Sequence, residues 1–263
     1  MNIGLRRIAQ AHLCTSVKHV MSEPPPVGNF NLKGVLTLVI IEALISPQQV
    51  AEYTKILTKV GWGNGTKTAM GMAADVKRNS QAEPTDPHVM ALANNLLARM
   101  GEHTSLVSAV LPHKIFPPCF NRYVKSETYG YHVDASIMRL PNSQEVMRSD
   151  VSMTLFLSSP EDYEGGELLI STDFGEQKVK LKAGDAVVYP SSSLHQVTPV
   201  TKGTRLAAIT WMQSLIPSPI TRQSLFELDK VIQDIAQNDE IDRNKLDRLH
   251  HVYHNLVRQH SVV

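Results

Sequence analysis

The chain has 263 residues, of which 42% are hydrophobic and 19% are charged, and its formal net charge is +1 at pH 7. This length and composition indicate one large globular domain, alone or with an appendage, and neither a disordered chain nor one with membrane spans. The small net charge gives no reason to expect a nucleic acid or a membrane surface as a partner.

The cysteine content and the first 31 residues bear on the compartment. Only Cys14 and Cys119 are present, too few for a disulfide framework, so we expect a reducing compartment and a cytoplasmic protein. Residues 1–22 contain three basic and no acidic residues, and three prolines follow at 24–26. We expect residues 1–31 to form a flexible extension outside the fold. An amphipathic targeting peptide is the alternative.

A strand and a helix are predicted next. Val35–Ile41 is a β-branched, apolar run typical of a buried strand. Ser46 and Pro47 then begin a helix, with Gln49 placed to complete a capping box. Apolar residues at helical spacing continue this helix to near Gly61. We expect it to cover the outside of a sheet.

A second covering helix is predicted to begin at Asp86–Pro87 by the same capping logic. Between the two helices, residues 62–69 contain two glycines around Asn64, and we expect a tight connection there. The apolar face of the second helix is predicted to carry Val89, Met90, Ala93, Leu96, Leu97 and Met100.

The apolar period changes from 3.6 to 2 after Ile115, which predicts short strands. The predicted strands are Phe120–Val124, Val151–Leu157, Glu167–Ser171, Val179–Leu181, Ala186–Tyr189 and Arg205–Trp211. Lys182–Asp185 is predicted to be a hairpin turn. So many short strands between residues 115 and 214 favour an α+β protein with a double-sheet β-barrel of the jelly-roll kind.

Two amphipathic helices are predicted in the last part of the chain. Their apolar positions are Leu225, Leu228, Val231, Ile232 and Ile235 in the first, and Leu249, Val252, Tyr253, Leu256 and Val257 in the second. His250 and His254 stand four residues apart, but they lie on a polar face without a third ligand. We expect them to be surface histidines.

One short pattern suggests a metal site. Residues i and i+2 of a strand point to the same face, so His132 and Asp134 can present an imidazole and a carboxylate side by side. With His195 they make two histidines and one carboxylate, the set that leaves three positions open in non-heme Fe(II) oxygenases. Each residue also has an ordinary explanation: a half-buried strand histidine, a turn cap and a hydrogen-bonded loop residue. The pattern alone is therefore weak.

Arg205 strengthens this hypothesis. It begins a predicted strand whose alternate residues are Ala207, Ile209 and Trp211, and a guanidinium on such a face is costly to bury unless an anion meets it. Arginine binds carboxylates through two parallel hydrogen bonds. An arginine close to a metal is what a dicarboxylate co-substrate would require.

Several motifs resemble the prolyl-4-hydroxylase-like Fe(II)/2-oxoglutarate dioxygenases, and from about residue 35 the chain resembles the bacterial PKHD-type hydroxylases. The matching stretches are Asn121–Tyr123, Tyr129–Asp134, Glu164–Leu168, His195, Arg205, Trp211, Trp62–Gly65, Thr68–Ala69, Val76–Asn79, Arg222–Asp229 and Val252–Leu256. The extension of about thirty residues departs from the family pattern. The resemblance implies a dioxygenase domain at residues 32–216, with its β core at about 115–214, and a C-terminal helical segment at residues 217–263.

The resemblance further implies a double-stranded β-helix in which His132, Asp134 and His195 bind Fe(II) and are the catalytic residues. Arg205 would bind the distal carboxylate of 2-oxoglutarate, Tyr123 would add its hydroxyl, and Trp211 would line the pocket. Tyr123 as a plain core aromatic is the alternative. The related halogenases have a small residue in place of the aspartate, so Asp134 favours hydroxylation. The family is also associated with L-ascorbate as a reductant.

These features predict a hydroxylase that uses 2-oxoglutarate, O2 and an organic substrate, which can be a protein side chain or a small molecule. The first alternative is a non-catalytic iron or 2-oxoglutarate sensor, because related bacterial proteins are associated with iron uptake and iron homeostasis. The second, a cupin-like metalloenzyme without a 2-oxo acid, leaves Arg205 without a role. The apolar C-terminal helices could support a homodimer.

Overall fold

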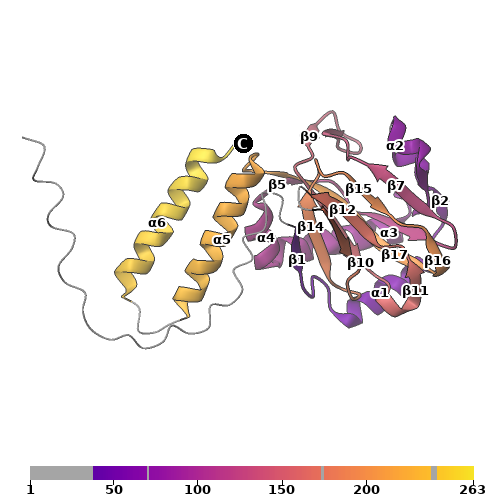
Figure 1. Ribbon diagram of the computed structural model, residues 1–263, viewed down its shortest axis with the longest axis horizontal. Coiled ribbons are helices and arrows are strands. Elements are labelled where there is room, and N and C mark those ends of the chain that lie inside the picture. The colour runs from indigo at the N-terminus through magenta and orange to yellow at the C-terminus, as the bar shows by residue number, and fades with distance from the viewer. Residues whose placement is uncertain (1–37, 70, 173–174, 238–241) are drawn as a thin grey trace, which may run out of the picture. The chain divides into compact units, whose positions relative to one another are not determined.

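The computed structural model describes residues 38–69, 71–172, 175–237 and 242–263. The predicted extension at residues 1–31 lies outside these ranges, and so does the start of the predicted strand Val35–Ile41. Within them, helices and short strands are mixed up to residue 110, the strands of residues 112–214 then follow with only one 3-10 turn among them, and two helices end the chain (Figure 1). None of the described helices combines the length and the apolar character that a membrane span needs.

The larger of two main sheets has eight strands, all paired antiparallel. In spatial order they are β1 (Val39–Ile41), β14 (Ala186–Pro190), β10 (Val151–Phe156), β17 (Arg205–Ser214), β6 (Cys119–Tyr123), β4 (Ser80–Ala82) and β2 (Trp62–Asn64), with β5 (Pro112–Ile115) also on β17. Residues 151–156 of the central strand β10 are all buried, because the sheet is covered on both faces.

The smaller sheet has five strands and is also antiparallel. Its order is β13 (Gly175–Val179), β12 (Leu168–Thr172), β15 (His195–Val197), β7 (Thr128–His132) and β3 (Lys77–Arg78). Two further pairs of strands are separate from both sheets: β11 (Tyr163–Gly165) with β16 (Val200–Gly203), and β8 (Ile137–Arg139) with β9 (Val146–Arg148).

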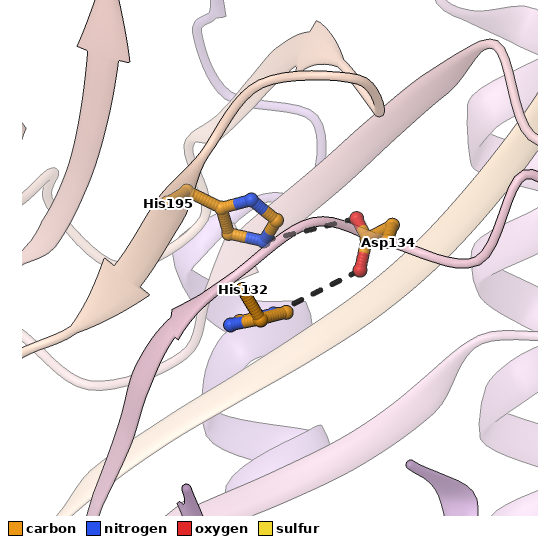
Figure 2. Close-up of side chains that lie close together, drawn as sticks. All are labelled: His132, Asp134 and His195. Atoms are coloured by element: carbon orange, nitrogen blue, oxygen red, sulfur yellow. Dashed lines mark ion pairs between the residues drawn. The ribbon is translucent and has the colours of Figure 1, made fainter. Parts of the chain in front are cut away.

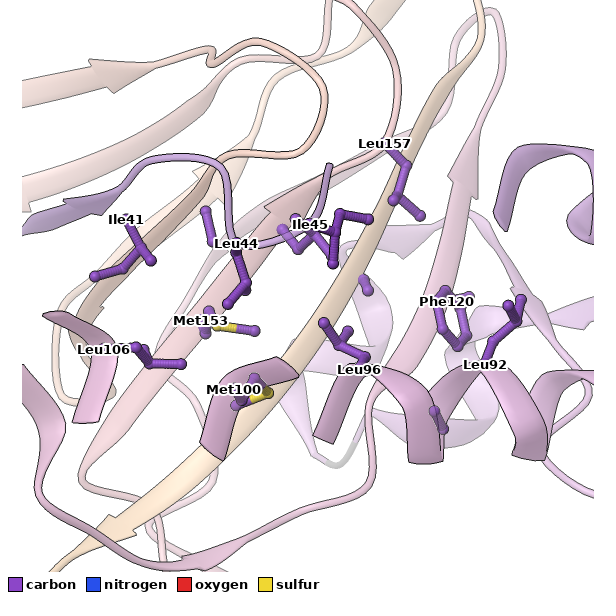
Figure 3. Packing of buried hydrophobic residues seen from close by; sticks show 14 of the residues in the cluster. Ile41, Leu44, Ile45, Leu92, Leu96, Met100, Leu106, Phe120, Met153 and Leu157 are labelled. Atoms are coloured by element: carbon purple, nitrogen blue, oxygen red, sulfur yellow. The ribbon is translucent and has the colours of Figure 1, made fainter. Parts of the chain in front are cut away.

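Helices cover the outer face of the larger sheet. They are α1 (Pro47–Leu57), α3 (Pro87–Glu102) and α4 (Thr104–Val110), and their apolar side chains share one buried cluster with the strands (Figure 3). The predicted caps are present: Ser46 completes a capping box with Gln49, and Asp86 accepts hydrogen bonds from the first turn of α3. The prediction that α1 and α3 cover the outside of a sheet is therefore confirmed.

A second apolar cluster lies between the two sheets and joins their inner faces. Tyr123, Phe156 and Val187 of the larger sheet pack there with Leu168 and Val197 of the smaller one. Because residues opposite each other on paired strands share a face, the register extends this inner surface. On the larger sheet it includes the row Asn121–Ala207–Phe156, and on the smaller sheet the row Lys77–Tyr129–Val197–Leu168.

The last two helices, α5 (Pro219–Ala236) and α6 (Arg243–His260), lie side by side (Figure 1) and have their own buried cluster. Ser218 and Asp242 cap their first turns. Ile232 is completely buried, as predicted, but Val231 and Val252 are about half exposed. Met90 on α3 is also half exposed, because the buried positions next to it are Val89 and Leu92.

Two predictions between residues 175 and 185 are wrong. The strand expected at Val179–Leu181 is β13, which ends at Val179. Lys182–Asp185 contains a turn in which Gly184 has a φ of 99°, but it is not a hairpin. It joins β13 to β14, which belong to different sheets, so the chain crosses between sheets there. Local turn residues indicate a reversal but not which strand pairs with which.

Residues 62–69 are more ordered than the predicted tight connection. They contain strand β2 and the 3-10 turn η1 (Gly65–Thr68), which Asn64 caps. The helix predicted to end near Gly61 ends at Leu57. The remaining short elements are α2 (Met72–Asp75) and the 3-10 turn η2 (Pro160–Asp162).

Candidate metal centre and adjoining cavity

His132 and His195 face each other across two paired strands of the smaller sheet. His132 ends β7, His195 begins β15, and their Cα atoms are register partners. Opposite residues on antiparallel strands share a face, so both imidazoles point between the sheets. Their ring centroids are 4.2 Å apart and both side chains are buried.

Each imidazole is held by a backbone carbonyl two residues earlier in the chain. His132 Nδ1 lies 2.8 Å from the oxygen of Gly130, and His195 Nδ1 lies 2.9 Å from the oxygen of Ser193. A carbonyl only accepts, so each Nδ1 carries the proton and each Nε2 keeps its lone pair. This is the tautomer that a metal-binding histidine needs, with its orientation already set.

Asp134 completes the cluster from just beyond the end of β7. Its Oδ1 lies 3.9 Å from Nε2 of His132, and its Oδ2 lies 3.7 Å from Nε2 of His195 (Figure 2). The three potential ligand atoms lie within 4.8 Å of one another, and they form the one such group found among the described residues. His250 and His254, predicted to be surface residues, belong to no such group, and His254 is exposed.

A serine on the larger sheet orients Asp134. Ser152 on β10 donates its hydroxyl hydrogen to Asp134 Oδ2 at 2.5 Å, and its oxygen lies 2.8 Å from the hydroxyl of Ser191. Ser152 is completely buried. The carboxylate is thus held from the sheet opposite to that of the two histidines, and the cluster spans both sheets.

The surroundings keep His132 neutral. Burial, and then the neighbouring His195 ring, lower the pKa of His132 to about 4. The ring of Tyr129 stacks on His132 with centroids 3.5 Å apart, and the ring of Tyr189 meets His195 edge-on at 5.1 Å. A neutral imidazole is the form that binds a metal.

The three side chains lie at a cavity of about 380 Å³ between the sheets. Trp211 lines it as predicted, and its ring meets Phe116 edge-on. Other lining residues are Lys77, Gln81, Cys119, Asn121, Tyr129, Thr154, Leu168, Tyr189, Val197 and Ile209, with Ala69, Ala73, Val133, Ala135, Met138 and Arg139. The volume is near the lower end of the range for ligand pockets, so it suits small groups.

Arg205 lies one row deeper than the cavity wall. Its strand partner is Tyr123, and the next row along the two strands pairs Ala207 with Asn121, which lines the cavity. Arg205 is only 1% exposed, yet none of its three guanidinium nitrogens makes a hydrogen bond within the described part of the chain. Its Cζ lies 5.1 Å from the Tyr123 ring centroid and 5.4 Å from that of Phe156. A buried cation without an acceptor indicates that an anion belongs there.

Two tyrosine hydroxyls near Arg205 are also buried without a hydrogen bond of standard geometry to a described residue. They belong to Tyr123 and to Tyr163 on β11, whose side chain lies next to that of Arg205 over Gly166. Burial raises the pKa of Tyr123 to about 12 and also raises the pKa of Tyr163. Both hydroxyls therefore keep their hydrogen at neutral pH and can donate it to an anion.

The structure brings His132, Asp134 and His195 together at a cavity that Trp211 also lines, and it places Arg205 beside Tyr123 on the larger sheet. Sequence reasoning did not single out three further buried polar residues near the site, Ser152, Tyr163 and Lys77. Ser152 had a signal, since it is a polar residue inside an apolar strand, but its partner Asp134 lies on another element. The neighbours of Tyr163 and Lys77 come from other strands, so the local sequence held no signal for them.

The fold and site define a class that comparison with known families identifies. Residues 118–213 match the model of the 2OG-Fe(II) oxygenase superfamily, and residues 220–261 match that of the PKHD-type hydroxylase C-terminal domain. The chain is thus a 2-oxoglutarate-dependent dioxygenase that uses Fe(II).

Curated relatives narrow the class further. A PKHD-type hydroxylase of Shewanella frigidimarina is 60% identical over 222 residues, which are 84% of this chain and 98% of that protein. One of Alteromonas mediterranea is 56% identical over 226 residues, 86% of this chain and 100% of that protein. The chain belongs to the PKHD-type hydroxylase family. The crystal structure of a Pseudomonas putida prolyl-4-hydroxylase is a more distant match, with 20% identity, a TM-score of 0.42, and coverage of 67% of this chain and 92% of that one.

Proposed function

We propose that this protein hydroxylates a small organic molecule or a single side chain, using O2 and 2-oxoglutarate and releasing succinate and CO2. The observation that carries the proposal is the convergence of His132, Asp134 and His195 at a cavity, with the buried cation of Arg205 one register row away from Asn121, which lines that cavity. A bound metal ion would explain why His132, Asp134 and His195 converge. A dicarboxylate co-substrate would explain the buried cation of Arg205.

We assign Nε2 of His132, Nε2 of His195 and the carboxylate of Asp134 as the iron ligands. Two histidines and one carboxylate suit Fe(II) and leave open positions for a co-substrate and O2. Because Asp134 supplies a ligand oxygen, we infer hydroxylation and not halogenation. The Gly130 and Ser193 carbonyls and the Ser152 hydroxyl hold the three ligands before any metal arrives.

Arg205 would bind the distal carboxylate of 2-oxoglutarate. Its guanidinium can donate two parallel hydrogen bonds, and the hydroxyls of Tyr123 and Tyr163 can donate one each. All these donors are buried and lack acceptors among the described residues, which is the arrangement expected of a preformed anion site. We therefore add Tyr163 to the residues suggested by the sequence.

When bound, Fe(II) supplies the chemistry that couples oxidative decarboxylation of 2-oxoglutarate by O2 to insertion of one oxygen atom into a substrate C–H bond. The chain positions the reactants and excludes water. Trp211 and Phe116 line one wall of the cavity, and Tyr129 and Tyr189 pack on the two imidazoles. These aromatic groups hold the two imidazole rings in place.

The remaining parts of the sequence hypothesis stay proposals. We propose that the two facing antiparallel sheets form a double-stranded β-helix within a domain at residues 32–216, followed by a helical segment at 217–263. A cytoplasmic location, a homodimer, ascorbate as a reductant, a link to iron homeostasis and the absence of nucleic-acid and membrane partners also remain predictions. Family membership favours the enzyme, and the comparisons lend no support to the sensor.

The test begins with protein loaded anaerobically with Fe(II) and 2-oxoglutarate. We expect a weak visible charge-transfer band, which reports chelation of the iron by the 2-oxo acid. Succinate release after admission of O2, screened over candidate organic compounds, would then identify substrates as those that raise the rate and appear hydroxylated by mass spectrometry. Absence of the band in the wild-type protein would contradict the assignment of the site.

A further inference from the structure

Lys77 is a buried cation in the wall of the metal cavity that the chemistry described so far does not use. It lies on β3, at the edge of the smaller sheet, and its register partner on β7 is Tyr129. The side chain lines the same cavity as His132 and is only 6% exposed. Its Nζ lies 5.0 Å from the centroid of the Tyr129 ring, which itself stacks on His132.

Lysine is rarely buried to this degree, because an ammonium loses strong hydration on leaving water. Burial accordingly lowers the pKa of Lys77, while Asp134 is among the groups that act in the opposite direction. The ammonium has three N–H donors, so it can bind a ligand in addition to the contacts it makes within the protein. A cation kept in such a place suggests a negatively charged ligand.

The charges around the cavity lead to the same conclusion. The described residues that line it include one acidic side chain, Asp134, and two basic ones besides the histidines, Lys77 and Arg139. The charge of Fe(II) together with that of Arg205 matches the charges of Asp134 and the two carboxylates of 2-oxoglutarate. With both groups bound, Lys77 and Arg139 therefore leave the cavity electropositive.

A second polar group faces the cavity on the opposite sheet. Asn121 on β6 is 3% exposed and lines the cavity, and its Oδ1 makes no hydrogen bond within the described ranges. A buried amide oxygen without a donor is costly, so a ligand with an N–H or O–H group would relieve it. Asn121 and Lys77 lie on the inner rows of facing sheets, so one ligand between the sheets could meet both.

We propose that the substrate is an organic carboxylate, with an N–H or O–H beside the carboxylate, whose negative charge is bound by Lys77 and whose donor group is bound by Asn121. A single ammonium matches one carboxylate, and the limited cavity volume suits a small molecule or one terminal residue. This inference rests on the proposed function, since it assumes that 2-oxoglutarate occupies the Arg205 side.

The experiment uses the full chain loaded anaerobically with Fe(II) and 2-oxoglutarate. The probes are N-acetylated amino acids, each tested as the free carboxylate and as the primary amide, with binding measured by calorimetry. A lost hydrogen bond to a charged group corresponds to about tenfold or more in affinity, so at least one carboxylate should bind that much more tightly than its amide. This comparison needs only the wild-type protein.

Variants then assign the preference to Lys77. Lys77→Met should remove the preference for the carboxylate, and Lys77→Arg should restore part of it. Arg78→Met is the matched control, because Arg78 is the exposed neighbour on the same strand and does not line the cavity, so the preference should persist. Circular dichroism of each variant checks that the fold is kept.

Two results would overturn the inference: no carboxylate binds more tightly than its amide, including the case where neither binds, or the preference survives in Lys77→Met. Calorimetry of 2-oxoglutarate with the Fe(II)-loaded protein separates this from failure of the proposed function. If 2-oxoglutarate does not bind, both the proposed function and the role of Lys77 are refuted. If it binds while the carboxylate preference is missing, only the role of Lys77 is refuted.

Discussion

The metal cluster and the polar group formed by Arg205, Tyr123 and Tyr163 differ in how their buried polar atoms are hydrogen-bonded. The imidazole Nδ1 atoms and the carboxylate of the cluster have hydrogen-bond partners from the chain itself. The guanidinium nitrogens of Arg205 and the hydroxyls of Tyr123 and Tyr163 have none within the described ranges. The first region is therefore organised before its ligand arrives, whereas the second is complete only with an anion.

Removing a metal ligand should have the largest effect. His132→Ala deletes one of three ligands, and we expect iron affinity to fall by more than about 100-fold, since even partners of ligands are worth 10- to 100-fold. The visible band with Fe(II) and 2-oxoglutarate should disappear. His113→Ala, at an exposed histidine, is the control and should keep the band. A band of normal intensity in His132→Ala would refute the assignment.

Replacing the unpartnered cation should separate the two regions. Arg205→Met should weaken 2-oxoglutarate binding by more than about 100-fold, because charged hydrogen bonds are lost, while iron binding stays close to normal. The ligand-free protein should not lose stability, since a buried charge without an acceptor is replaced by an apolar side chain. Calorimetry and thermal unfolding measure the two effects.

Equal loss of iron and 2-oxoglutarate binding in Arg205→Met would contradict the division into two regions. A large loss of stability without ligand would show that Arg205 has a structural partner. Arg78→Met removes an exposed arginine and should change neither quantity.

The hydroxyl that orients Asp134 should matter less than a ligand. Ser152→Ala removes the hydrogen bond to Oδ2, and we expect iron affinity to fall by about 10- to 100-fold with little change in 2-oxoglutarate binding at saturating iron. Titration with Fe(II) followed by the visible band measures the change. Unchanged iron affinity would mean that the histidine carbonyl contacts alone organise the cluster.

The smallest effect is expected at Tyr163. Tyr163→Phe removes one neutral donor from the proposed anion site beside Arg205, which should weaken 2-oxoglutarate binding by about 3- to 10-fold and leave iron binding unchanged. In the ligand-free protein the unpartnered hydroxyl is lost, so stability should not fall. A drop in stability without any change in 2-oxoglutarate affinity would assign Tyr163 a purely structural role.

The sequence predicted much of this molecule because the relevant signals are local. Ser46 and Asp86 cap helices through atoms within three residues, and alternation of apolar residues located β6, β10, β14 and β17. The hairpin expected at Lys182–Asp185 failed because the choice between a hairpin and a crossing depends on strands far along the chain.

By itself, the sequence determined which residue types are present, their spacing and their local structure, and together with the family resemblance it suggested His132, Asp134 and His195 as the metal ligands. Only the tertiary structure decided that His132 lies opposite His195, that Ser152 holds Asp134, and that Arg205, Tyr163 and Lys77 are buried. The reason is physical: hydrogen-bond partners and burial in a sheet structure depend on contacts between strands that are remote in sequence, and local propensity does not encode them.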